Sequence, residues 1–352
     1  MERAAASKRM LTVFLLLSLV SFFADLTYEG ARSISGPYLS GLGASLIIVG
    51  SLSIGEAISY LARLIAGLLS YRYASPRFYW GMVFAGYIVN LTAVPLLALA
   101  GEWEIAFTLY IVERIGKGLR APTRDAILSE VGSRLGAGKL FGVHELLDQA
   151  GAITGALFMA ASLESRGVSS AFILLGIPAA MAILLLSFSY TLYPNPRVAA
   201  KPQAGFRDTV ARSVKLSIPL VLSIAPFVHW ATAGSLLSAR ESMADIALAY
   251  ALAMAVDALS AIPLGVLYDM VGPRSLIVLP IASVLATLSL LAMHLMLFAA
   301  LWGLAMAGYE TIAKAYIASR TGLGERGIVY GVVYALVGAG WTLGNVFIAS
   351  II

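Results

Sequence analysis

Long apolar segments alternate with short polar ones along the whole chain. A transmembrane helix needs about 20 consecutive, mostly apolar residues, and each apolar segment approaches or exceeds that length. The polar interruptions carry Gly, Pro or charged residues, as loops between helices do. The pattern therefore predicts an all-α polytopic membrane protein with 11 spans, at residues 10–33, 45–70, 78–100, 105–131, 139–162, 170–192, 213–237, 243–267, 275–294, 296–319 and 327–352.

The distribution of Lys and Arg between the spans predicts the orientation. Cytoplasmic loops of membrane proteins are enriched in these residues. With the N-terminus in the cytoplasm, the outer loops contain only Arg166 and Arg240. We therefore expect a multi-pass protein of the plasma membrane with a cytoplasmic N-terminus. The cytoplasmic segments would then contain Arg3, Lys8, Arg9, Arg72, Arg77, Arg134, Lys139, Arg197, Lys201, Arg207, Arg212, Lys215, Arg274, Arg320 and Arg326.

A long polar stretch and an internal repeat divide the chain in two. Residues 193–212 are rich in Pro and basic residues, which favours a linker. Residues 142–155 align without gaps to residues 331–344, with 6 of 14 positions identical. Such self-similarity at matching helices indicates a duplication. We predict an N-terminal six-helix bundle at 1–192, a cytoplasmic linker at 193–212 and a C-terminal five-helix bundle at 213–352.

Composition excludes several classes of protein. Hydrophobic residues make up 60% of the chain and charged residues 12%, against roughly 25% charged residues in soluble domains. Without cysteine there is neither a disulfide nor a thiolate metal site. The sequence has no GxxxxGK[ST], HExxH or GxSxG motif. We therefore expect no enzyme, no cofactor, no metal and no nucleic-acid partner, and we assign the net charge of +5 to basic loops.

Three motifs mark particular helices. The loop after the eighth span reads Gly265-Val-Leu-Tyr-Asp269-Met-Val-Gly272-Pro-Arg274, the fourth span contains Arg114-Ile-Gly-Lys117-Gly118, and the fifth contains Gly151-x-x-x-Gly155. With the two halves and the basic linker, these motifs resemble those of the major facilitator superfamily of secondary transporters. The resemblance implies two bundles that rock around a midplane site lined by helices one, four, seven and ten. It also implies an inner gate held by ionic contacts of Asp269 and Arg274.

The chain departs from that pattern at three places. The first-half loop at residues 70–77 has no acidic residue, and Ala156 stands where the glycine motif of antiporters continues with proline. The superfamily usually has twelve helices, whereas the predicted spans end with the eleventh. The expectation is therefore a fold whose twelfth helix is missing, or a fragment.

Charged residues inside the spans are the main candidates for function. A charge near the bilayer centre costs roughly 2.5–3.5 kcal/mol on insertion scales, so it normally faces a cavity or a partner. Asp25, Glu29 and Arg32 share one face of the first helix, because they are four and three residues apart. The fourth span contains Glu113, Arg114, Lys117, Arg120 and Arg124, and the tenth contains Glu310 and Lys314.

These residues admit two interpretations. A buried carboxylate that binds and releases a proton couples substrate movement to proton flow, since burial favours its neutral form and a nearby cation its charged form. The alternative is a fixed salt bridge between helices one and four. We assign proton coupling or substrate binding to Asp25, Glu29, Arg32, Glu113, Arg114, Lys117, Glu310 and Lys314. Candidate gate residues, or plain basic anchors, are Arg120 and Arg124 beside Asp269 and Arg274. Candidate cavity residues are Tyr28, Asp148, His229, Trp230 and Tyr309.

The predicted function is proton-coupled secondary transport, with export of small organic compounds favoured. Uptake of an anionic metabolite is the runner-up, because the fourth span is rich in basic residues. A non-transporting, truncated relic or scaffold is the third possibility. The expected partners are the lipid bilayer, a small-molecule substrate and protons, and we expect the protein to act as a monomer.

Overall fold

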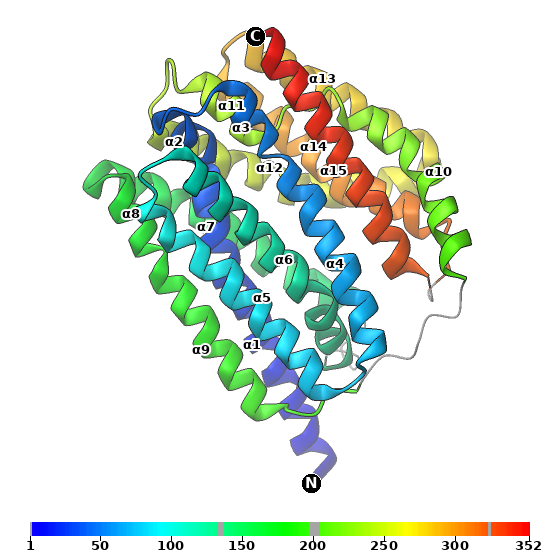
Figure 1. Ribbon diagram of the computed structural model, residues 1–352. Coiled ribbons are helices and arrows are strands. Elements are labelled where there is room, and N and C mark those ends of the chain that lie inside the picture. The colour runs from blue at the N-terminus through cyan, green and yellow to red at the C-terminus, as the bar shows by residue number, and fades with distance from the viewer. Residues whose placement is uncertain (1, 132–136, 198–204, 323–324) are drawn as a thin grey trace.

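Helices make up almost all of the structure, a computed structural model that describes residues 2–131, 137–197, 205–322 and 325–352. The long helices lie side by side, with the N-terminus at one end of the molecule and the C-terminus at the other (Figure 1). No β-strand occurs in these ranges. The helices are α1 (Glu2–Ser33), α2 (Ser35–Gly41), α3 (Leu46–Ser51), α4 (Ile54–Arg72), α5 (Pro76–Leu96), η1 (Leu97–Leu99), α6 (Trp103–Val131), α7 (Ala137–Arg166), α8 (Val168–Leu174), α9 (Gly176–Leu192), α10 (Phe206–Ile224), α11 (Trp230–Leu237), α12 (Met243–Val271), η2 (Gly272–Ile277), α13 (Val278–Leu291), α14 (Leu295–Ala318) and α15 (Arg326–Ile351).

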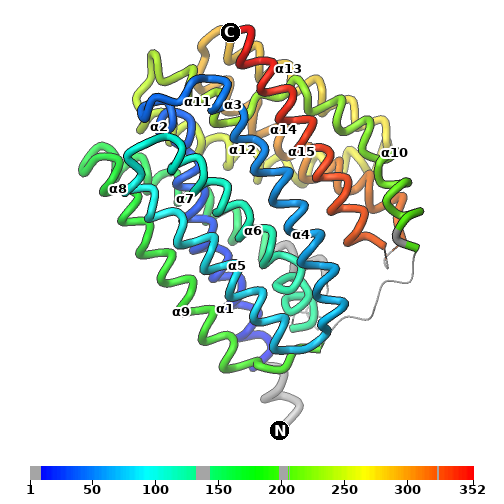
Figure 2. The backbone as a smooth tube through the Cα atoms, viewed as in Figure 1, coloured from blue at the N-terminus to red at the C-terminus, as the bar shows by residue number. Residues whose placement is uncertain are grey.

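Glycines allow close contact in two pairs of helices, α1 with α7 and α10 with α15. A Cβ atom on Gly155 of α7 would lie 2.3 Å from the carbonyl oxygen of Leu26 in α1. Its counterpart in the repeat, Gly344 of α15, would meet the carbonyl oxygen of Ala225, beside α10. Figure 2 shows α15 lying between α10 and α4. The two copies of the repeated segment therefore make equivalent helix contacts, as small residues do in membrane proteins.

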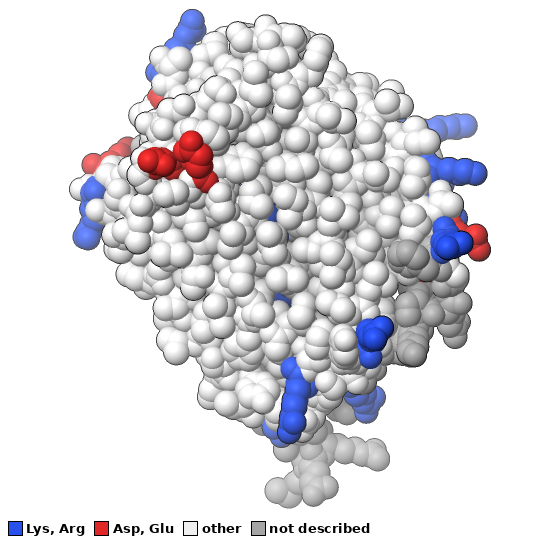
Figure 3. Space-filling view, in the orientation of Figure 1, with Lys and Arg blue, Asp and Glu red and all other residues white. Residues whose placement is uncertain are grey.

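The exterior is apolar over most of its area. In the described part, eight helical stretches are long and apolar enough to cross a bilayer. Large apolar side chains such as Leu259, Ile262 and Leu343 are more than 70% exposed, which suits contact with lipid. Figure 3 shows a face that is mostly free of charge, with Lys and Arg near its lower end and right margin. The prediction of an all-α, multi-pass membrane protein is confirmed. The stretches are Arg9–Ser33, Leu46–Arg72, Pro76–Leu99, Val143–Arg166, Val168–Leu192, Met243–Leu291, Leu295–Ala318 and Arg326–Ile351.

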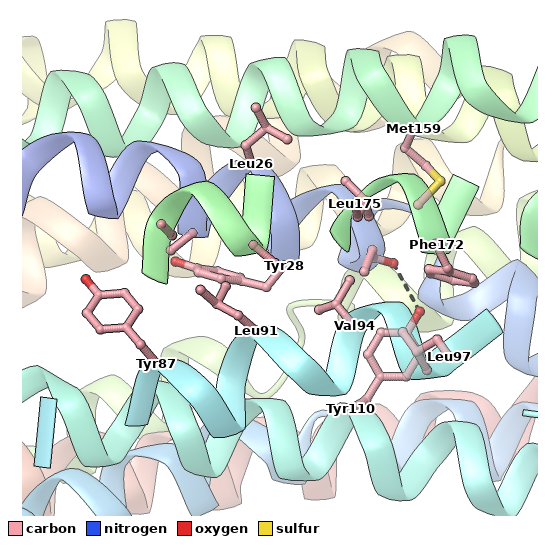
Figure 4. Close-up of a cluster of buried hydrophobic side chains, with 14 of the residues drawn as sticks. Leu26, Tyr28, Tyr87, Leu91, Val94, Leu97, Tyr110, Met159, Phe172 and Leu175 are labelled. Carbon is pink, nitrogen blue, oxygen red and sulfur yellow. Dashed lines mark hydrogen bonds between the residues drawn. The ribbon is translucent and has the colours of Figure 1, made fainter. Parts of the chain in front are cut away.

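Buried apolar side chains form two clusters. The first joins α1, α5, α6, α8 and α9. Figure 4 shows part of it, with Tyr28 beside Leu91 and Phe172 between Met159 and Leu97. The second is built mainly from α10 to α15 and from a few alanines of α7. The predicted boundaries at residues 192 and 213 stay a prediction, and residues 198–204 of the predicted linker lie outside the described residues.

The span expected at residues 213–237 is not one helix. It ends as α10 at Ile224 and resumes as α11 at Trp230. The carbonyl oxygen of Phe227 accepts the indole N–H of Trp341 at 2.5 Å, and that of Val228 accepts the indole N–H of Trp302 at 3.0 Å. The expectation of a continuous helix was wrong because side chains distant in sequence satisfy the freed backbone groups.

The glycine contacts predict opposite effects for two similar substitutions. Gly155→Ala should lower the melting temperature of the purified protein in detergent, because the added methyl group overlaps the backbone of α1. Gly81→Ala is the matched control, since Gly81 lies in α5 with open space around it. There the higher helix propensity of Ala, worth about 1 kcal/mol, should leave stability unchanged or raised. Equal melting temperatures for the two variants would contradict the close packing of Gly155 against the backbone of α1.

Candidate functional site

A cavity of about 350 Å³ lies between the two hydrophobic clusters. Side chains from α1, α4, α6, α7, α10, α12, α14 and α15 line it. Its lining contains eight carboxylates and six basic side chains, an unusual density of charge for the interior of an apolar molecule. The acidic residues are Asp25, Glu29, Glu56, Asp125, Glu145, Asp148, Asp257 and Glu310, and the basic ones are Arg32, Arg63, Lys117, Arg120, Arg124 and Lys314.

A continuous ion-pair network joins three helices on one wall. Glu29 lies 3.5 Å from both Arg32 and Lys117. Arg32 also contacts Glu56 of α4 at 3.0 Å, and Arg114 of α6 contacts Glu56 at 3.7 Å. Glu29 and Arg32 lie on one face of α1, as their spacing in the sequence predicts. The carboxylate that links Arg32 to Arg114 is Glu56. Pairing of this kind allows charges to remain in an apolar interior.

The network ends inside the protein at a buried amide. Glu113 contacts Arg114 at 3.0 Å and accepts a hydrogen bond from the side chain of Asn90 at 2.6 Å. Both Glu113 and Arg114 were predicted to take part in coupling or binding. The structure places them behind the wall, next to α5, and neither lines the cavity. Their position favours a supporting role for the network over direct contact with a ligand.

One hydrogen bond connects this network to the opposite wall. The hydroxyl group of Tyr250 in α12 donates to Oε2 of Glu29 at 2.6 Å. Glu29 therefore has partners on α1, α6 and α12. The sequence offered no signal for Tyr250, because one tyrosine in an apolar helix is an ordinary core residue.

Arg120 differs from the other basic residues of the wall. It is 1% exposed, and its guanidinium group lies over the ring of Tyr87 at 4.2 Å and near that of Tyr28 at 5.8 Å. Within the described residues no carboxylate lies within 4 Å of it, and its Nε atom has no hydrogen-bond partner. Arg124, by contrast, pairs with Asp125, which also contacts Arg63 at 2.7 Å. Arg120 is thus a buried cation whose close contacts are aromatic rings, and Asp25 acts on it electrostatically from beyond ion-pair distance.

The remaining acidic residues lie mainly on α7, α12 and α14. Asp257 is 3% exposed and accepts a hydrogen bond of 3.4 Å from Gln149. Among the described residues, Glu310 and Lys314 form no ion pair within 4 Å, although they are one turn apart. On α7, Asp148 lies 3.5 Å from His144, and one of its oxygens has no hydrogen-bond partner. This wall carries an excess of acid that the described side chains do not neutralise.

Helices α1 to α9 form one set and α10 to α15 the other, and the two sets of helices meet at the end of the molecule where α2 and α11 lie (Figure 1). The hydroxyl groups of Ser40 and Ser235 are 2.6 Å apart. The indole N–H of Trp230 donates to the carbonyl oxygen of Ser33 at 2.8 Å. A Cβ atom on Gly36 would overlap the backbone of α11, so the two elements touch directly. These contacts seal the cavity at that end.

The structure places several predicted residues away from the cavity. Trp230 belongs to the seal, and His229 packs against Trp341 at 5.0 Å, so neither lines the cavity as expected. Asp269 and Arg274 are exposed and make no ion pair within 4 Å in the described part, so the proposed gate contact is not formed here. On the lining itself lie Asp25, Tyr28, Glu29, Arg32, Lys117, Arg120, Arg124, Asp148, Tyr309, Glu310 and Lys314.

Asn345 is a further residue that the sequence interpretation missed. Its side chain accepts from the backbone N–H of His229 at 2.6 Å and donates to the carbonyl oxygen of Phe227 at 3.2 Å. It thereby holds the break between α10 and α11. A signal was present, because amides are scarce in this chain and a buried amide in a membrane helix usually bonds across helices.

Comparisons with known proteins begin with sequence. No protein-family model matches the chain. An uncharacterised protein of Mycobacterium tuberculosis is 34% identical, over 98% of this chain and 87% of the relative. An uncharacterised MFS-type transporter of Methanocaldococcus jannaschii is 28% identical, over 92% of this chain and 84% of the relative. The alignments thus span nearly the full chain.

Solved structures agree on the fold. A mutant of the nucleoside transporter NupG superposes with a TM-score of 0.76 at 16% identity, over 96% of this chain and 91% of NupG. A bacterial homologue of the human lysosomal transporter Spinster, in an inward-facing and unoccupied conformation, gives a TM-score of 0.72 at 18% identity. That match covers 97% of this chain and 82% of the homologue.

The ion-pair network predicts a large loss of stability for one conservative change. Glu56→Gln removes the anion shared by Arg32 and Arg114, whose side chains are 9% exposed. Removing one partner of a buried pair costs about 3–5 kcal/mol, and we expect the lower end because Glu29 and Glu113 remain. Unfolding in detergent would measure it.

Arg197→Gln is the control for that measurement. The side chain of Arg197 is 93% exposed and pairs with Glu130 at 3.6 Å, so its loss should cost less than about 1 kcal/mol. Equal destabilisation of the two variants would mean that the buried network contributes no more than a surface pair.

Proposed function

We propose that the chain is a secondary transporter of the major facilitator superfamily that moves a small molecule across the membrane by alternating access. The observation that carries this proposal is the charged cavity between the two sets of helices, sealed at one end. A cavity at the midplane between rocking halves is where such carriers bind their substrates. The transporter names of the similar proteins support the same function.

Coupling to protons follows from the unneutralised carboxylates of the cavity. Asp25 is 7% exposed, and no basic side chain of the described part lies within 4 Å of its carboxylate. Asp148 on α7 is close enough to interact with it electrostatically. Two neighbouring carboxylates in a poorly hydrated site readily share a proton, because both charged forms together are unfavourable. Asp25 is therefore the first candidate for the coupling site, followed by Asp148, Asp257 and Glu310.

Export of small organic compounds in exchange for protons is the direction that we propose. Carboxylates outnumber basic side chains on the lining, and the excess lies on the wall of α7, α12 and α14. Such a wall attracts a positively charged group or a proton, and the two compete for it. The glycines Gly151 and Gly155 carry no weight here, since they serve the packing of α7 on α1.

Uptake of an anionic metabolite is the second candidate, and Arg120 is the observation that favours it. The sequence suggested that the basic residues of α6 attract an anion. Two of them on the lining, Lys117 and Arg124, already have carboxylate partners, which reduces that attraction. Loss of only anion transport in Lys117→Gln would favour uptake over export.

The proposed setting is the plasma membrane, with the N-terminus in the cytoplasm and the protein acting as a monomer. In that orientation, the seal of α2 and α11 lies on the outer side. The structure would then represent the state in which the cavity is closed to the outside.

The coupling proposal predicts a loss of proton movement in one variant. Substrate-driven proton flux into proteoliposomes should occur with the wild type and be abolished in Asp25→Asn, because an amide cannot take up a proton. Asp125→Asn is the matched control, since Asp125 is already held by Arg63 and Arg124. It should retain flux.

A panel of organic cations, zwitterions and anions would serve as substrates in that assay. Flux that persists in Asp25→Asn would move the coupling site to Asp148, Asp257 or Glu310. The absence of flux with wild type for every compound would contradict proton-coupled transport and favour the non-transporting relic.

Alternating access predicts that a reversible cross-link at the seal stops transport. The chain has no cysteine, so Ser40→Cys/Ser235→Cys would contain only the introduced pair. The two hydroxyl oxygens are 2.6 Å apart, so the sulfur atoms of cysteines at these positions would lie close to each other. Oxidation should abolish transport and reduction should restore it, whereas either single variant should be insensitive to oxidant. Full transport by the oxidised, cross-linked protein would rule out opening at this end.

A further inference from the structure

Two buried side chains of opposite charge face the same cavity from different helices without an ionic partner. Arg120 on α6 is 1% exposed and Asp257 on α12 is 3% exposed. Within the described residues, neither has an oppositely charged group within 4 Å. A buried, uncompensated charge is unfavourable, so each position is prepared for a ligand of the opposite sign.

The surroundings of Arg120 favour a ligand with one negative charge. Its two aromatic neighbours, Tyr28 and Tyr87, hold the guanidinium group in place and leave its hydrogen-bond donors free. The nearby Lys117 pairs with Glu29, and Arg124 pairs with Asp125. Arg120 is therefore the cation of this wall without an ion-pair contact, with Asp25 acting on it electrostatically from farther away. A single cation matches a monovalent carboxylate better than a dianion.

Asp257 lies in the middle of an apolar helix on the opposite wall. Its only hydrogen bond in the described structure comes from Gln149 and is long, at 3.4 Å. The carboxylates of Glu310 and Glu145 and the ammonium group of Lys314 are close enough to interact with it electrostatically, so acid outnumbers base around Asp257. The other carbonyl-type oxygen nearby, Oε1 of Gln149, is buried and has no donor. These are acceptors in need of N–H donors, which an ammonium group supplies.

We propose that the cavity binds a small zwitterion, with its carboxylate on Arg120 and its ammonium group on Asp257. This inference rests on the proposed transport function and specifies its substrate class. An organic anion would leave Asp257 unpaired, and an organic cation would leave Arg120 unpaired. A zwitterion neutralises both charges. Because Arg120 and Asp257 belong to different sets of helices, the bound zwitterion also connects the two sets.

The cavity also accommodates an apolar side chain on the ligand. Its volume of about 350 Å³ lies at the lower end of the range for small-molecule sites. Trp302, Tyr309 and Trp341 contribute aromatic surface to the lining. This volume and the aromatic lining suit a compound the size of an aromatic amino acid or a small dipeptide.

A matched set of probes tests the proposal by direct binding. Phenylalanine carries both charges, 2-phenylethylamine lacks the carboxylate and 3-phenylpropionate lacks the amine, while alanylphenylalanine carries the charges farther apart. Binding to the purified, full-length protein is followed by tryptophan fluorescence, because Trp302 and Trp341 line the cavity. At least one zwitterion should bind about tenfold or more tightly than both singly charged probes.

Variants identify which residue holds which group. Arg120→Gln should weaken zwitterion binding by about tenfold and leave 2-phenylethylamine unchanged, whereas Asp257→Asn should weaken the zwitterion and leave 3-phenylpropionate unchanged. Arg120→Lys keeps the cation and should restore part of the affinity. Arg63→Gln is the matched control, because Arg63 lines the cavity but pairs with Asp125.

The outcomes separate this inference from the proposed function. Binding of a singly charged probe as tightly as the zwitterions, or no binding of either zwitterion, would overturn the zwitterion site. Retained affinity in both Arg120→Gln and Asp257→Asn would overturn it as well. Zwitterion binding without any flux in proteoliposomes would contradict the proposed transport but not the zwitterion site. Proton-coupled flux of 2-phenylethylamine, without flux of either zwitterion, would contradict the zwitterion site but not the proposed transport.

Discussion

The pairing of charges inside an apolar molecule is the constraint on which the rest of the structure depends. Glu29 satisfies it by contacting Arg32, Lys117 and Tyr250, three residues of three helices. Since removal of a partner leaves a charge uncompensated in a medium of low dielectric, each contact fixes the position of the helix that supplies it. The ion pairs of Glu56 extend the constraint to α4, so the charged residues serve as tertiary contacts as well as candidate ligands.

Close packing at glycines occurs both within each set of helices and between the sets. Within a set, glycines allow backbones to touch, as between α1 and α7, and large apolar clusters fill the space. Between the sets, Gly36 lies against the backbone of α11 and Gly338 lies against that of α4. Further connections are single hydrogen bonds, such as those from Trp230 to Ser33 and from Tyr250 to Glu29. A hydrogen bond contributes only about 0.5–1.5 kcal/mol net, so these links can open while the sets stay intact.

The distinction between paired and unpaired charges also changes the interpretation of α6. Its many basic residues suggested an anion site, but Arg114, Lys117 and Arg124 each contact a carboxylate. Only Arg120 among them is left without one in the described structure. The number of basic residues in a helix is therefore a poor guide to ligand charge, because neighbouring helices supply the counterions.

The sequence by itself determined the all-helical membrane fold, because long apolar segments have no other stable arrangement in a bilayer. It also indicated the charged cavity residues, since each charge in a span requires a partner or water. Tertiary structure alone decided which charges are paired. Glu56 joins Arg32 to Arg114, while Asp257 and Arg120 remain without ionic partners in the described part of the chain. It also decided that α10 ends before Trp230, where Trp302, Trp341 and Asn345 satisfy the open backbone. These features arise from contacts between residues that are far apart in the sequence, some by more than a hundred positions. Local sequence patterns carry no information on such contacts.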